Sequence, residues 1–125
     1  DIYMIPKDQD LTEQYIKSII TQLDELYESD VETYDLFYYE VDKKVFNDYL
    51  TFVPFEMNME KIKKRLENGF YRHKEAIIND INLIETNCAR YNQSGTEIID
   101  WAKELCNSLR QAVKGSLDLE SFKKQ

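Results

Sequence analysis

The segment from Glu85 to Ile98 reads Glu-Thr-Asn-Cys-Ala-Arg-Tyr-Asn-Gln-Ser-Gly-Thr-Glu-Ile, and it connects two stretches of helical periodicity. It closes one amphipathic helix, turns through polar residues and Gly95, and starts the next helix. Asn92 follows the aromatic Tyr91 at the break. A carboxamide there offers two N–H donors and an acceptor oxygen, so it can bind another amide without a charge. The alternative is that Asn92 only ends the helix, because Asn tolerates the left-handed cap conformation.

The two helices in the middle of the chain are predicted from their apolar spacing. Apolar residues recur at intervals of four and three from His73 to Tyr91, which predicts one long amphipathic helix. Asn58 is the expected N-cap of the helix before it, and Asn68-Gly69 is its expected end.

The first and last helices have the same kind of stripe. The first is expected to run from Leu11 to about Glu28, with Asp10 as its cap. The last is expected to start at the capping box Ser94-Gly95-Thr96-Glu97 and to fade after Gly115.

No helical stripe persists from Ser29 to Phe55, but this segment is rich in aromatic residues: Tyr34, Phe37, Tyr38, Tyr39, Phe46, Tyr49, Phe52 and Phe55. Unstructured linkers are poor in aromatic residues, so we expect an ordered loop with a short helical turn between Lys43 and Leu50. Long ordered loops inside compact domains usually have a function.

Length and composition fit one all-α domain, a four-helix bundle with a long ordered loop after its first helix. The chain has 125 residues, of which 42% are hydrophobic, and it has only 3 Gly and 2 Pro. We expect the domain to span residues 11–117, between tails at 1–10 and 118–125. No run of eighteen apolar residues predicts a membrane span, and no signal pattern opens the chain. Because it starts at Asp1 without Met, we expect it to be part of a larger protein.

Charge and residue inventory exclude several functions. The chain has 16 Lys+Arg against 24 Asp+Glu, a net charge of −8 that disfavours direct nucleic-acid binding and favours a basic peptide partner. Cys88, Cys106 and the single His73 cannot build a structural zinc site, and two cysteines at apolar helical positions favour a reduced intracellular setting. There is no nucleophile–base pair or glycine-rich phosphate loop, so we expect neither an enzyme nor a cofactor.

Four short motifs fall in order on these elements: Phe37 with Val41, Asn47-Asp48-Tyr49, Met57-Asn58-Met59, and Asn87-Cys88-Ala89-Arg90-Tyr91-Asn92. With them the chain resembles a bromodomain, the module that reads acetylated lysine, over roughly Leu11 to Val113. Within that family, residues 62–72 and 84–95 are similar to the first bromodomain of the WD-repeat and bromodomain proteins.

The resemblance implies an acetyl-lysine pocket formed by Asn92, Tyr49, Phe37, Val41, Phe46, Cys88, Tyr91 and Ile98. It implies that the Asn92 amide donates a hydrogen bond to the acetyl carbonyl, and that the Tyr49 hydroxyl contacts the same oxygen through water. The implied partner is an acetylated H3 or H4 histone tail, read in the nucleus by a monomeric domain of a multidomain protein.

This chain departs from the family pattern in the loop. The family's Trp-Pro-Phe shelf is Asp35-Leu36-Phe37 here, and three residues, Tyr34, Tyr38 and Tyr39, are candidates to replace the missing aromatic wall. Glu40 and Glu56 stand where the family has prolines, so we expect a looser loop. We expect no carboxylate at the pocket floor. The alternative function is therefore a degenerate bromodomain that serves as a structural or protein-interaction module.

Overall fold

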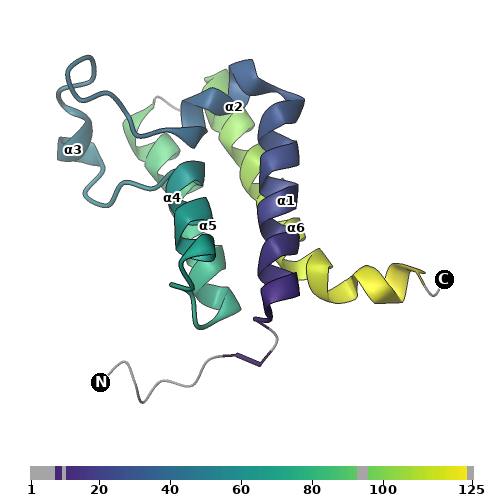
Figure 1. Ribbon diagram of the computed structural model, residues 1–125. Helices are drawn as coiled ribbons and strands as arrows, with labels where there is room; N and C mark the ends of the chain where they lie inside the picture. The colour runs from purple at the N-terminus through teal and green to yellow at the C-terminus, as the bar shows by residue number, and fades with distance from the viewer. Residues whose placement is uncertain (1–7, 10, 93–95, 124–125) are drawn as a thin grey trace, which may run out of the picture.

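A computed structural model describes residues 8–9, 11–92 and 96–123, with side chains as far as residue 115. This part of the chain contains no strand and six helices: α1 (Glu13–Ser29), α2 (Val31–Tyr38), α3 (Tyr49–Phe52), α4 (Met59–Glu67), α5 (Lys74–Tyr91) and α6 (Glu97–Lys123). Helices α1, α4, α5 and α6 form the bundle, while α2 and α3 belong to the connection between α1 and α4 (Figure 1). The predicted all-α four-helix bundle is confirmed.

Helix α1 starts two residues later than expected. Its N-cap is Thr12, whose hydroxyl accepts a hydrogen bond from the Tyr15 backbone N–H at 3.1 Å. The prediction of Asp10 as the cap is therefore wrong, and Asp10 itself lies outside the described residues. The first turn of a helix has backbone N–H groups without a partner inside the helix. The Thr12 hydroxyl satisfies one of them.

The loop after α1 contains a helix that the sequence analysis missed. Asp30 ends α1 and caps α2, since its side chain accepts the Thr33 backbone N–H at 3.3 Å. Only Phe37 among the eight residues of α2 is buried, so no apolar stripe marks the helix. In the segment Lys43–Leu50, where a short helical turn was expected, the Phe46 backbone N–H donates to the Asp42 carbonyl at 2.9 Å, and α3 begins at Tyr49.

The predicted ends of the middle helices are confirmed. The Asn58 side chain caps α4 by accepting the Lys61 N–H at 2.8 Å, and the chain leaves α4 through Asn68 and Gly69, whose φ is +67°. Helix α5 begins after His73, but its first N–H groups are capped from elsewhere: Asp8 accepts the Lys74 N–H at 3.2 Å.

Helix α6 continues to Lys123 and does not fade at Gly115. A glycine inside a helix lowers helix stability by about 1 kcal/mol relative to alanine, but it keeps the backbone N–H that the helix needs. In Figure 1 the last turns of α6 extend away from the bundle. The expected capping box at the start of α6 includes Ser94 and Gly95, which lie outside the described residues.

The bundle core is apolar and continuous through all four helices. Leu23 of α1, Met59 of α4, Ile77 of α5 and Leu105 of α6 have no exposed surface. Complete burial of such a side chain stabilises the fold by roughly 1.5–3 kcal/mol. None of the described helices is long and apolar enough to cross a membrane.

One carboxylate, Asp80 of α5, is buried at the edge of this core. It accepts a hydrogen bond from the Tyr71 hydroxyl at 2.6 Å and pairs with Arg65 of α4 at 2.7 Å. Burial, and next the bond to Asp80, raises the pKa of Tyr71, so this phenol stays a donor. The three side chains join α4 to α5.

Candidate functional site

A cavity of about 140 Å³ lies where the loop meets the C-terminal end of α5 and the start of α6. Its lining includes all eight predicted site residues: Phe37, Val41, Phe46, Tyr49, Cys88, Tyr91, Asn92 and Ile98. The lining also includes seven residues that the sequence analysis did not assign to the site: Leu36, Tyr39, Glu56, Met57, Asn58, Ile84 and Asn87. The structure thus brings the predicted residues together, and their contacts with a ligand stay a prediction.

Asn92 presents its amide at the end of α5. Asn92 is the C-cap of α5, as the alternative interpretation expected, but its backbone is extended (φ −99°, ψ 152°) and not left-handed. The side-chain nitrogen donates to the Cys88 carbonyl at 3.0 Å and lies 3.6 Å from the Cys88 sulfur. The first bond fixes the amide, while sulfur is a weak acceptor. The second N–H is therefore available to a stronger acceptor in the cavity.

Tyr49, the first residue of α3, is buried, with 8% of its surface exposed. Its hydroxyl has no hydrogen-bond partner among the described residues. Burial, and next the charge of Glu56, raises the pKa of Tyr49 to about 12. The phenol is therefore neutral at physiological pH and able both to donate and to accept a hydrogen bond.

Apolar side chains from three parts of the chain form the walls. Phe37 comes from α2, Val41 and Phe46 from the loop, and Ile98 from the first turn of α6. Phe37 is buried, whereas Phe46 is 45% exposed and forms the rim. This lining can hold an apolar group between the loop and the bundle.

Tyr91 is the centre of an aromatic cluster on the loop side of the cavity. The rings of Phe46, Tyr49 and Phe52 lie 6.1, 4.9 and 6.1 Å from it in edge-to-face arrangements. Its hydroxyl donates to Asp48 at 2.6 Å, and this bond is the main cause that raises the pKa of Tyr91. The cluster fixes α3 against the last turn of α5.

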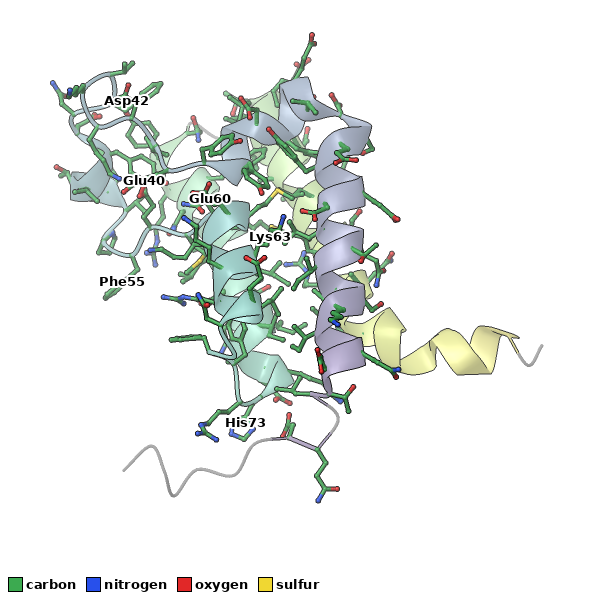
Figure 2. The ribbon with its side chains drawn as sticks, in the orientation of Figure 1. Glu40, Asp42, Phe55, Glu60, Lys63 and His73 are labelled. Atoms are coloured by element: carbon green, nitrogen blue, oxygen red, sulfur yellow. The ribbon has the colours of Figure 1, made fainter. Side chains whose placement is uncertain are left out.

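Two glutamates hold the loop that they were expected to loosen. The Lys43 ammonium lies 2.6 Å from Glu56 and 2.9 Å from Glu40, and Glu56 also accepts the Val41 N–H at 3.3 Å. Burial acts to lower the pKa of Lys43, but the bonds to both glutamates outweigh it and raise that pKa. These contacts connect residues 40–43 with Glu56 near the end of the loop, while the looser loop stays a prediction. Figure 2 shows Glu40 on the loop beside the bundle.

Glu56 is a carboxylate in the lining of the cavity, whereas the expectation concerned only the pocket floor and named no carboxylate there. Only 12% of its side chain is exposed. No sequence rule pairs it with Lys43, which lies thirteen residues earlier in irregular backbone. The negative charge of Glu56 at the cavity is therefore paired with the positive charge of Lys43.

Asn87 connects the other end of the loop to α5. Its side-chain nitrogen donates to the Phe55 carbonyl at 2.7 Å, and its side-chain oxygen is buried without a hydrogen-bond partner among the described residues. The ring of Phe55 points away from the bundle in Figure 2 and is 71% exposed. The Asn-x-x-x-Tyr-Asn spacing was the available sign that Asn87 belongs to this region.

Of the three tyrosines that were candidates to replace the missing shelf aromatic, only Tyr39 lines the cavity. Tyr38 stacks on Tyr27 with ring centroids 4.1 Å apart, and Tyr39 meets Tyr38 edge-on at 4.7 Å. Asp35, at the position of the family's Trp, accepts the Tyr27 hydroxyl at 2.7 Å. Tyr39 is thus the tyrosine at the cavity, and it is supported by Tyr38 and by Tyr27 of α1.

Other chemistry lacks the side chains that it needs. No group of three His, Cys, Asp or Glu side chains in the described part of the chain is placed to hold a metal ion. Burial raises the pKa of the Cys88 thiol, which leaves it a poor nucleophile. Beside the carboxylate of Glu56, which is paired with Lys43, the cavity offers an amide, a neutral phenol and apolar walls, which suit a small neutral ligand group.

Comparisons with known proteins agree with this fold. The family model described as "Bromodomain" matches residues 9–104. A bromodomain and WD repeat-containing protein of Dictyostelium discoideum is 29% identical over 106 residues; these cover 85% of this chain but only 5% of the relative. The second bromodomain of Candida albicans Bdf1, solved with a bound imidazopyridine, superposes with a TM-score of 0.71 at 20% identity. That match covers 81% of this chain and 98% of the Candida domain.

Proposed function

The chain belongs to the bromodomain family, and on that basis we propose that its cavity binds acetylated lysine of the H3 or H4 histone tails. Bromodomains are acetyl-lysine reader modules and not enzymes. The observation that carries the proposal is that the Asn92 amide and the Tyr49 hydroxyl, which has no hydrogen-bond partner among the described residues, line the same cavity between apolar walls. These are the groups that a neutral amide on an alkyl chain requires.

Selectivity for the acetylated side chain follows from desolvation. An unmodified lysine ammonium placed among Phe37, Val41 and Ile98 would lose its water, at a cost of several kcal/mol. Acetylation removes the charge and leaves a neutral amide, and the apolar stem of the lysine then gains from burial. The pocket distinguishes the two forms mainly by rejecting the charge.

Hydrogen bonds orient the acetyl group. The second Asn92 N–H donates to the acetyl carbonyl, and the Tyr49 hydroxyl reaches the same oxygen through an ordered water. Each neutral hydrogen bond contributes only about 1 kcal/mol net. Binding of a single acetylated site is therefore expected between roughly 1 mM and 1 μM, or about −4 to −8 kcal/mol.

The partner is proposed to be a basic peptide. The net charge of −8 attracts lysine-rich tails and repels the phosphates of nucleic acid. The chain spans about 5% of the length of the Dictyostelium relative. We place the reader, as a monomeric domain, in a larger protein. Its proposed location is the nucleus, where it would regulate transcription on chromatin. As in that relative's description, WD repeats are the proposed neighbours.

The alternative, a degenerate domain without ligand binding, rested on the loop substitutions. Glu40 and Glu56, which stand where the family has prolines, both pair with Lys43. Because the loop is held by these contacts and the cavity retains Asn92 and Tyr49, reading of acetyl-lysine is the better supported function.

Calorimetric titration with acetylated and unacetylated H3 and H4 tail peptides tests the proposal. We expect heat of binding only with acetylated peptide, and at least about tenfold weaker binding by Asn92→Ala. Asn79→Ala is the matched control, because Asn79 is an exposed residue of the same helix outside the cavity. Equal binding of both peptide forms, or unchanged affinity in Asn92→Ala with circular dichroism confirming the fold, would contradict the proposal.

A further inference from the structure

Glu56 is the only charged side chain among the described residues that line the cavity. Its carboxylate is 12% exposed, so water screens it poorly. Alone, this carboxylate would attract the ammonium of an unmodified lysine and lessen the desolvation penalty that excludes it. A pocket with an unpaired Glu56 would therefore discriminate poorly between the free and the acetylated side chain.

Lys43 cancels that charge from outside the cavity. Its ammonium lies 2.6 Å from one Glu56 oxygen and 2.9 Å from the other, and Lys43 is not part of the cavity lining. Two opposite charges at this distance act on a third charge only as a dipole, so the field inside the cavity is small. The Val41 N–H, donating to the same carboxylate at 3.3 Å, fixes its position.

Both charges reach the polar end of the cavity. After burial, which is the largest cause, the charge of Glu56 raises the pKa of Tyr49 and the charge of Lys43 lowers it. The two effects oppose each other at the hydroxyl that is proposed to hold the water of the acetyl group. Glu40 also pairs with Lys43, at 2.9 Å, but its side chain is 72% exposed, so water screens its charge.

We propose that Lys43 determines the specificity of the pocket, because by neutralising Glu56 it keeps a free lysine ammonium from binding. The inference rests on the proposed binding of acetyl-lysine at the same cavity. Lys43 acts through Glu56 and touches no ligand. Its loss is expected to raise the affinity for unmodified lysine while the affinity for acetyl-lysine falls.

The test measures binding of an H4 tail peptide, acetylated at its lysines or unacetylated, by NMR shift titration, which reaches millimolar affinities. The ratio of the two dissociation constants is the readout, because a loop that is merely loosened would weaken both peptides alike. In Lys43→Met we expect this ratio to fall about tenfold. Adding Glu56→Gln should restore it, since no carboxylate then remains to attract the ammonium.

Two controls separate the pair from general charge effects. Lys63→Met removes an ammonium of similar exposure, 27%, that pairs with Asp24 at 2.9 Å away from the cavity, and should leave the ratio unchanged. Figure 2 shows Lys63 on α4, apart from the loop that carries Glu40. Lys43→Arg keeps the charge and should keep the ratio, and Lys43→Gln is the second neutral variant should Lys43→Met not fold.

The outcomes separate this inference from the proposed function. If the protein without substitutions binds the acetylated and the unacetylated peptide equally, the proposed function is overturned, and the inference with it. If the protein without substitutions prefers the acetylated peptide and the neutral Lys43 variants prefer it equally strongly, the inference alone is overturned. A double variant as unselective as Lys43→Met would also overturn it, because Glu56 would then not be the cause.

Discussion

Two ion pairs in this molecule are nearly identical in length and exposure but connect different parts of the chain. Lys43 and Glu56 lie 2.6 Å apart with side chains 31% and 12% exposed, and Arg65 and Asp80 lie 2.7 Å apart with side chains 30% and 12% exposed. The first pair joins the two ends of a loop beside the cavity. The second joins helices α4 and α5 of the bundle.

The difference lies in what surrounds each carboxylate. Asp80 stands in the middle of α5, fixed by the helix backbone, and also accepts the Tyr71 hydroxyl. Glu56 stands in irregular backbone that can turn toward water if its partner is lost. Distance and exposure alone therefore do not reveal whether an ion pair contributes to stability or to binding.

The largest expected effect comes from breaking the pair in the bundle. Asp80→Ala leaves Arg65 and the Tyr71 hydroxyl without their acceptor, so we expect the free energy of unfolding to fall by about 3–5 kcal/mol. Urea unfolding followed by circular dichroism measures the loss. Asp80→Asn, which keeps the shape and an acceptor oxygen, should lose less. A loss below about 1 kcal/mol in Asp80→Ala would mean that the pair is only a surface contact.

The tyrosines beside the two carboxylates sharpen the comparison. Tyr71→Phe removes a buried bond to a carboxylate and should lower the free energy of unfolding by about 1.5–3 kcal/mol. Tyr49→Phe removes a hydroxyl without a protein partner, so stability should hardly change while the affinity for acetylated peptide falls about fivefold, or about 1 kcal/mol. Equal stability losses in both variants would erase the distinction.

Breaking the loop pair should affect stability little. In Lys43→Met we expect the free energy of unfolding to fall by at most about 1 kcal/mol, because Glu56 can rotate into water. Thermal unfolding of Lys43→Met and Asp80→Ala under the same conditions compares the two losses of stability directly. A loss in Lys43→Met as large as that in Asp80→Ala would show that the loop is part of the folding core.

The last prediction concerns the pH dependence of stability. The pKa of Tyr49 is raised to about 12 from its ordinary value of 10, so the folded state holds this proton more tightly than the unfolded chain. The resulting stabilisation is present below pH 10 and is lost as pH rises through 12. Between pH 9.5 and 11, the stability of the unmodified chain should fall more steeply than that of Tyr49→Phe. Parallel profiles would mean that Tyr49 is not buried.

The bundle was predictable because its helices bury regular stripes. Ile77, Ile81 and Ile84 of α5 are all buried as the spacing predicted, and the polar cap at Asn58 has its expected bond. Helix α2 was missed because it is short and buries only Phe37. Gly115 was read as an end because glycine has low helix propensity, which the continuing backbone bonds of α6 override.

The site was predictable only in part. Residues in recognisable motifs, such as Asn92 and Tyr49, were assigned to the site, and the structure places them at one cavity. Glu56 was expected only to loosen the loop, because a missing proline is visible in a sequence whereas an ion pair across thirteen residues of irregular backbone is not. Such a pair depends on where the loop folds back, and no periodicity encodes that.

The side-chain amide of Asn92 gives the most direct test of how the cavity is used. Its NMR resonances, assigned with Asn92→Ala, would be followed while acetylated and unacetylated H4 tail peptides are added. We predict that the Asn92 side-chain amide and the Val41 backbone amide shift with the acetylated peptide alone, while amides near Asp80 stay in place. Shifts that spare Asn92, or that occur equally with the unacetylated peptide, would contradict the account.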